Sequence, residues 1–361
     1  MVRRRAQVLG LALLVAIASV AAPAGQARTV AALPDRLSDA EFWKLSEEFS
    51  EPNGYFRSDN LLSNELFYPE VLPELVARIK PGGVYLGVGP EQNFNYIVAI
   101  RPRMVFITDV RRGNLHTQLM YKALFELSAD RAEFVSRLFT KPRPAGLAAE
   151  STGTQLMQAY WDVATSEQAV FDANLKAIQD HLTRSHQLPL GKEDLEGIAA
   201  VYGQFYWHGP SITYNSSNGG GRGNNMANYA QLMSATDDRG VGQSYLATEA
   251  GFRFMKDLEN RNMVVPIVGN FGGPRALRAV GQYVRDKGAV VSVFYLSNVE
   301  QYLRQDGLHG VFCANVATMP LGPESTFIRS QSWGGGGGFR NLLGDMQAET
   351  QGCAAPAAGQ R

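Results

Sequence analysis

Two short apolar runs, separated by a glycine-containing turn and a helical stretch, place the strongest constraint on the fold of this chain. The first run is Val84–Val88, and the second is Met104–Thr108, which ends at Asp109. Strand, helix and strand within about 26 residues form a βαβ unit, whose strands run parallel and whose crossover is right-handed. The sequence therefore predicts an α/β protein with a mostly parallel, Rossmann-like sheet.

The alternation of strands and helices resumes in the last third of the chain. Further strands are predicted near residues 263–268, 289–296, 310–316 and 325–329, and helices near 245–260, 274–286 and 298–304. Upstream of the βαβ unit, helices are predicted over 38–49, where Ser38 and Glu41 have capping-box spacing, and near 69–80.

A long helical pattern interrupts this alternation. From residue 114 to about 205, apolar positions recur every three or four residues. We therefore expect a single α/β domain over 28–330 that carries a helical insertion at about 114–205. Five consecutive glycines at 334–338 predict a flexible C-terminal tail over 331–361.

The first 27 residues have the three-part pattern of a secretory signal peptide. A basic start with Arg3, Arg4 and Arg5 precedes an apolar stretch, and cleavage after Ala24 or Ala27 fits the small residues that follow. A retained membrane anchor and a misassigned start codon are the alternatives. We expect export to the periplasm, the cell envelope or the medium, with no stable membrane span after cleavage.

Composition narrows the class of protein. The chain has 34 basic and 34 acidic residues, and 45% of its residues are hydrophobic. This balance excludes a disordered chain and argues against a nucleic-acid partner, which would require a basic surface. Removing the three arginines of the signal leaves 34 − 3 = 31 basic residues against 34 acidic ones, so the mature chain carries about −3. Cys313 and Cys353 either pair in the oxidising compartment or remain free thiols.

The turn after the first strand is the leading candidate for a ligand site. Gly87, Gly89 and Glu91 lie where that strand ends, and Asp109 ends the next one. Glycines there allow a ligand to approach the backbone, and an acidic residue at that distance accepts hydrogen bonds from ribose hydroxyls. Gln92 replaces the third glycine of the dinucleotide fingerprint, which favours an S-adenosylmethionine-type ligand over a dinucleotide. The alternative is a tight turn beside an exposed acidic strand end.

Two other strand ends are candidate pocket walls. Asn270 and Phe271 follow the strand near 263–268, where Phe271 can stack on a planar group, and Asn298 and Glu300 follow the strand near 289–296. Helix capping explains both segments equally well.

No metal site is predicted. The histidines are His116, His181, His186, His208 and His309. Only His181 and His186 approach metal-ligand spacing, and because they are five residues apart they miss the same face of an α-helix.

Several long segments carry a resemblance to a known family. These include GGVYLGVGPEQNF, ITDVRR, NMVVPIVGNFGGPRALRAVG and FYLSNVEQYL, together with STFIRS. Over roughly residues 40–330 the chain resembles an uncharacterised bacterial family with a class I methyltransferase-like Rossmann fold, which includes a leptospiral surface protein. The resemblance implies a seven-stranded sheet and puts Gly87, Gly89 and Asp109 on the adenosylmethionine-binding positions. Members of that family often have Asp where this chain has Asn270, so a carboxylate is absent there.

Two functions follow as expectations. One is a methyltransferase-like transferase that uses S-adenosylmethionine, for which no catalytic residue is assigned. The other is a non-catalytic exported binding or interaction protein that reuses the fold, since a fold does not determine a function. Export favours the second, because adenosylmethionine is kept in the cytosol.

Overall fold

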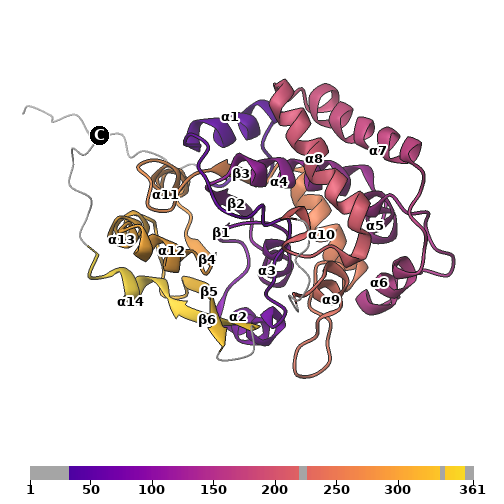
Figure 1. The fold of residues 1–361 in the computed structure, drawn as a ribbon. Helices are drawn as coiled ribbons and strands as arrows, with labels where there is room; N and C mark the ends of the chain where they lie inside the picture. Colours follow the sequence, from indigo (N-terminus) through magenta and orange to yellow (C-terminus); the bar gives the residue numbers. More distant parts are fainter. Residues whose placement is uncertain (1–31, 219–225, 334–337, 354–361) are drawn as a thin grey trace, which may run out of the picture. The chain divides into compact units, whose positions relative to one another are not determined.

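The structure, a computed structural model, describes residues 32–218, 226–333 and 338–353. These residues form a mixed α/β fold around one six-stranded sheet (Figure 1). The strands are β1 (Val84–Gly87), β2 (Met104–Asp109), β3 (Val264–Val268), β4 (Val291–Ser297), β5 (Thr326–Trp333) and β6 (Gly338–Asp345). Their order is β3-β2-β1-β4-β5-β6, and every pairing is parallel except that of β5 with β6. The predicted α/β class with a mostly parallel sheet is confirmed.

Fourteen α-helices accompany the sheet within the described ranges. They are α1 (Asp39–Phe49), α2 (Leu72–Arg78), α3 (Gln92–Ile100), α4 (Arg112–Leu127), α5 (Arg131–Phe139), α6 (Gly153–Trp161), α7 (Gln168–Asp180), α8 (Lys192–His208), α9 (Tyr229–Ser234), α10 (Glu249–Asn260), α11 (Ala276–Asp286), α12 (Val299–Gln305), α13 (His309–Ala317) and α14 (Met346–Thr350). The predicted capping box is present, because the Ser38 hydroxyl accepts from the N–H of Glu41 while the Glu41 carboxylate accepts from the N–H of Ser38.

The central strands are buried on both faces. Every residue of β1, β2 and β3 is buried, because helices cover the sheet and leave no solvent-facing side. Helix α4 contacts β2, β3 and α10, while α1 contacts β3 and α11. This double cover explains why the strands read as continuous apolar runs rather than as alternating ones.

The long helical segment lies between β2 and β3. Helix α8 packs against α4, α5 and α7, and α6 packs against α9. Figure 1 shows α5–α9 gathered beside the sheet on the side of α4 and α10. These helices therefore extend the core beside the sheet, and Tyr214 and Met226 of the same segment reach a cavity at the strand ends.

Two expectations about the C-terminal third are wrong, and the number of strands differs from the one that the resemblance implied. The segment predicted as a strand at 310–316 is helix α13, in which Phe312 and Val316 are one turn apart and buried. The tail predicted over 331–361 is ordered where described, since β6 pairs with β5 along its whole length and α14 follows it. Six strands are present in the described residues, not the seven that the resemblance implied.

The cysteines of α13 and of the segment after α14 are joined. Cys313 and Cys353 form a disulfide, with their Cα atoms 5.5 Å apart. The predicted signal peptide lies outside the described residues. Among the helices that the structure describes, none has the length and apolar character needed to cross a membrane.

Candidate functional site

A cavity of about 370 Å³ opens at the carboxyl ends of five neighbouring strands. Its wall includes Gly89 after β1, Asp109 at the end of β2, Asn270 after β3, Ser297 at the end of β4, and Ser330 of β5. Strand order reverses between β1 and β4, and ligands of open α/β sheets bind at such a switch point. Four separately predicted segments thus converge on one cavity.

The turn after β1 is built around Asn93. Its amide donates to the carbonyls of Val88 and Pro90, and its carbonyl accepts from the Tyr85 hydroxyl at 2.9 Å. A Cβ on Gly87 would lie 1.8 Å from Asn93 Oδ1, so Gly87 makes room for Asn93 and does not line the cavity. Gly89 does line it, with a left-handed φ of 75° that favours glycine.

The turn that follows β2 positions the side chain of Asp109 at the cavity wall. Its Oδ1 accepts from the backbone N–H of Arg111 at 2.9 Å, whereas its Oδ2 has a longer, 3.4 Å contact with Arg111 Nη2. One oxygen is therefore engaged by the turn, and the other retains capacity to accept from a ligand hydroxyl.

Asn270 and Phe271 line the same cavity, and both also serve the protein's own structure. Asn270 Oδ1 accepts from the N–H of Gly272 at 2.8 Å, which closes the turn after β3. Phe271 packs against Phe294 and Phe312 in the core. Their contribution to the cavity is mainly its shape.

Of the predicted pair Asn298 and Glu300, only Asn298, at the start of α12, lies in the cavity wall. Glu300 pairs with Arg329 of β5 and with His309 of α13. Burial opposes its ionisation, yet the hydrogen bond and charge of Arg329 hold its pKa below the usual value. Glu300 therefore joins elements and does not face a ligand.

A buried carboxyl that sequence reasoning missed completes the wall. Glu65 accepts from Tyr295 Oη at 2.7 Å, from Ser297 Oγ at 2.6 Å and from Asn341 Nδ2 at 2.6 Å. Burial raises its pKa above the usual value, although these hydrogen bonds oppose that rise. Ser297 has a left-handed φ of 48°, a strained conformation of the kind that concentrates at functional sites. No local pattern signals Glu65, because its partners are 230 to 276 residues away.

Glu91, the remaining predicted residue, lies behind the wall. It is fully buried, its Oε1 accepts from the N–H of Ser63, and its Oε2 has no partner. Burial raises the pKa of Glu91 to about 8, although the Ser63 hydrogen bond opposes this. A mostly neutral, buried carboxyl is in contact with the protein and not with the cavity.

The lining combines aromatic rings with more acidic than basic groups. Glu65, Asp109 and Asp306 contribute carboxyl groups, and Arg57 contributes a guanidinium. The aromatic residues of the wall are Tyr55, Phe56, Tyr214, Phe271, Tyr295, Tyr302 and Phe339. Arg57 is itself engaged by Tyr302, with Nη2 3.3 Å from the hydroxyl. Such a lining suits a flat, neutral or cationic ligand better than a phosphate.

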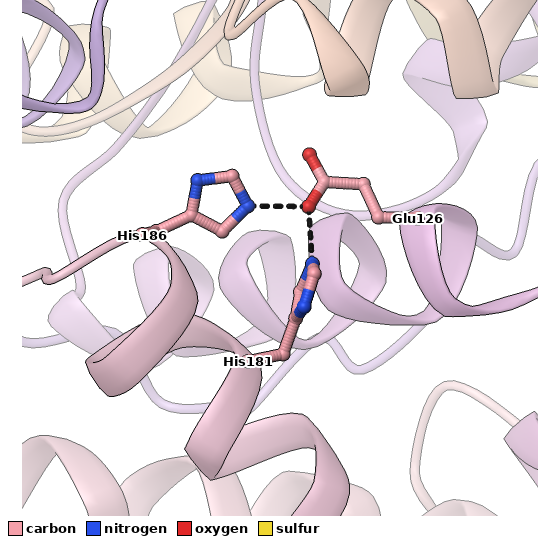
Figure 2. Close-up of side chains that lie close together, drawn as sticks. All are labelled: Glu126, His181 and His186. Carbon is pink, nitrogen blue, oxygen red and sulfur yellow. Dashed lines mark hydrogen bonds and ion pairs between the residues drawn. The ribbon is translucent and has the colours of Figure 1, made fainter.

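Two histidines form a separate cluster, and the expectation that they miss one another is wrong. After α7 the chain continues as a π-helical turn, η2 (His181–Ser185), in which the N–H of His186 donates to the carbonyl of His181. A π-turn stacks residues five apart, so both rings face Glu126 of α4, as Figure 2 shows. Spacing alone could not reveal this, because side chains five residues apart lie on different faces of an α-helix.

The fold and cavity together define an α/β protein with an aromatic, acid-lined cavity at the carboxyl edge of a mostly parallel sheet. The chain belongs to the family described as "Domain of unknown function (DUF7790)", which matches residues 61–196 and 204–346. No curated protein matches the chain. The matched segments contain most of the cavity wall and all three residues of the histidine cluster.

Proposed function

We propose that the cavity binds a nucleoside-type small molecule, with S-adenosylmethionine as the first candidate, on a Rossmann-like sheet of the class I methyltransferase type. The observation that carries the proposal is the position of Asp109, at the end of β2, in the wall of a cavity at the β1/β4 switch point.

The order of the strands supports the Rossmann-like part of the proposal. Parallel strands in the order 3-2-1-4-5 bind nucleotides where the order reverses, and here the cavity lies at that reversal. The antiparallel β6 beside β5 extends this sheet by a hairpin.

The chemistry of the lining supports a nucleoside without phosphates. Asp109 Oδ2 can accept from a ribose hydroxyl, and the aromatic side chains can stack on a base. The wall offers a pyrophosphate one guanidinium, that of Arg57, which Tyr302 already engages. A sulfonium or ammonium group is compatible with the same lining, which makes S-adenosylmethionine a better fit than a dinucleotide.

Binding is the first test. Titration calorimetry with S-adenosylmethionine, S-adenosylhomocysteine and adenosine should show micromolar binding by the intact protein. Asp109→Asn keeps the size of the side chain but halves its acceptor capacity, so we expect affinity to fall roughly tenfold or more, which corresponds to the loss of one hydrogen bond to a charged group.

Asp238→Asn is the matched control for this test, because Asp238 is exposed and does not line the cavity. It should leave affinity unchanged. Absence of binding for all three compounds, or equal affinity of Asp109→Asn and the unsubstituted protein, would contradict the proposal.

The second candidate is a non-catalytic exported binding protein that uses the same cavity. The signal-peptide pattern of residues 1–27 favours it, because export separates the protein from cytosolic adenosylmethionine. Methyl transfer needs little beyond positioning of the reactants, so the lining does not separate the two candidates. Incubation with methyl-labelled S-adenosylmethionine and host extract separates them: labelled product supports the transferase, and binding without turnover supports the binding protein.

A further inference from the structure

Three side chains from two distant segments of the sequence converge near the C-terminal end of α4. His181 Nε2 lies 2.6 Å from Glu126 Oε2, and His186 Nε2 lies 2.5 Å from the same oxygen (Figure 2). The three facing atoms all lie within 4.8 Å of one another. Two imidazoles and one carboxylate are a ligand set that zinc and similar divalent metals take in proteins.

The Nδ1 atom of His186, which is not the nitrogen that contacts Glu126, faces a carboxylate, as the second nitrogen of a metal-binding histidine often does. This atom lies 2.6 Å from Asp39 Oδ1, and the same oxygen accepts from Asn262 Nδ2 at 2.8 Å. A carboxylate on the far nitrogen fixes the tautomer that presents a lone pair on Nε2. This second carboxylate comes from α1, independently of the three converging residues.

The second oxygen of Glu126 is engaged elsewhere, which leaves Oε2 for an ion. Lys122 Nζ donates to Glu126 Oε1 at 2.7 Å and to the carbonyl of Glu259 at 2.6 Å. Glu126 thus faces the two imidazoles with Oε2 and the ammonium of Lys122 with Oε1. A divalent cation at Oε2 would be attracted by the carboxylates of Glu126 and Asp39.

We propose that Glu126, His181 and His186 bind a zinc-class divalent metal ion, with at least one remaining position open to water. Two ligand atoms of a tetrahedral zinc ion lie about 3.3 Å apart. Glu126 Oε2 is closer than this to both histidine nitrogens, so a small rotation of the Glu126 side chain would admit the ion. The His181 side chain is 20% exposed, which gives the ion access from solvent.

The position of this site separates it from the cavity. Helix α4 begins beside Asp109 at the carboxyl edge of the sheet and runs for 16 residues, or about 24 Å, so Glu126 lies at its other end. Its ligands come from α4, from η2 and from the residue directly after η2, and the supporting carboxylate comes from α1. The ion would tie the turn after α7 to α4, which packs against β2 and β3.

Metal binding is measured on the intact protein after treatment with a chelator. Titration with Zn²⁺ should give one site and raise the thermal midpoint by several degrees, because the ion binds the folded state. Co²⁺ should give visible absorption bands of a nitrogen- and oxygen-ligated site. Mg²⁺ should do neither, because imidazole is a poor ligand for it.

Variants locate the ion. His181→Ala should lower the Zn²⁺ affinity roughly 100-fold or more, and Glu126→Gln should do the same. Asp39→Asn should lower it roughly 10- to 100-fold, as expected when a supporting partner of a ligand is removed. His208→Ala, at an exposed position of α8, is the matched control and should change nothing.

Each result decides for or against the site. No stoichiometric Zn²⁺ binding, or unchanged affinity in His181→Ala, would overturn the proposal. The Glu126 side chain is buried, so the affinity of Glu126→Gln counts only if the circular dichroism spectrum of this variant matches that of the unsubstituted protein. If the spectra differ, the result for His181→Ala decides, because His181 is partly exposed. None of these readouts depends on a ligand in the cavity.

Discussion

Glu91 shows what burial does to a single ionisable side chain. Its folded-state pKa is about 8, against an ordinary value of 4.5. Between these values the folded protein holds a proton that the unfolded chain releases, so the free energy of unfolding falls as pH rises from about 4.5 to about 8. Each pKa unit corresponds to about 1.4 kcal/mol. The free energy of unfolding should therefore fall by roughly 5 kcal/mol across this pH range if the folded structure does not change.

Glu91→Gln should remove most of this dependence. Glutamine is neutral at every pH and keeps an acceptor for the N–H of Ser63. We expect the variant to be more stable than the unsubstituted protein by a few kcal/mol at about pH 9 and similar at about pH 4.5. Urea unfolding across this pH range measures the difference. Glu48→Gln, on the exposed face of α1, is the control and should keep the original slope; equal slopes for all three proteins would refute the argument.

At the scale of elements, α13 and α14 show how contacts override local pattern. The segment from 310 to 316 is rich in β-favouring residues, yet it folds as a helix because Phe312 and Val316 face the core. Asn315 fixes this helix by donating to the carbonyls of Phe271 and Gly273, both at 2.9 Å. Strands β5 and β6 pair with each other, and the composition of residues 331–345 does not predict this pairing.

The disulfide between Cys313 and Cys353 should stabilise this region substantially. It closes a loop with a sequence separation of 40, which restricts the unfolded chain by roughly 4 kcal/mol in the chain-entropy description. Cys313→Ser with Cys353→Ser should therefore lower the thermal midpoint, and a thiol reductant should lower that of the unsubstituted protein similarly. The reductant should have no effect on the double variant, which is the control. Two reactive thiols in the untreated native protein would show that the bond is absent.

At the scale of the whole molecule, charge and location are linked. The three arginines at positions 3–5 balance the formal charge of the full chain, and they belong to the segment expected to be removed. An exported chain would carry about −3 and would fold where its disulfide can form. The compartment in which the protein works therefore determines which small molecules and which metal ions it can meet.

Export makes a prediction for the chain in its native host. Mass spectrometry of the protein should find a mature N-terminus after Ala24 or Ala27. Replacing Arg3, Arg4 and Arg5 together by Glu should retain the protein in the cytosol, whereas replacing them by Lys should not, because the signal requires positive charge. A cytosolic protein that keeps Met1 would contradict export and favour the transferase.

The sequence alone determined the elements whose signals are local. Continuous apolar runs identified β1, β2 and β3, and the Ser38–Glu41 spacing identified the start of α1, because burial on both faces and helix capping each leave a short-range pattern. The rule that ligands bind at strand ends also singled out Gly89, Asp109, Asn270 and Asn298, and all four line one cavity.

Only the tertiary structure decided which distant side chains meet. Glu65 reaches Asn341 across 276 positions, and Glu126 meets His186 across 60. Gly87 and Glu300 resembled site residues in sequence, but one makes room for Asn93 and the other pairs with Arg329. A residue's neighbours along the chain report its backbone conformation, whereas its chemistry depends on partners that only folding brings within hydrogen-bond distance.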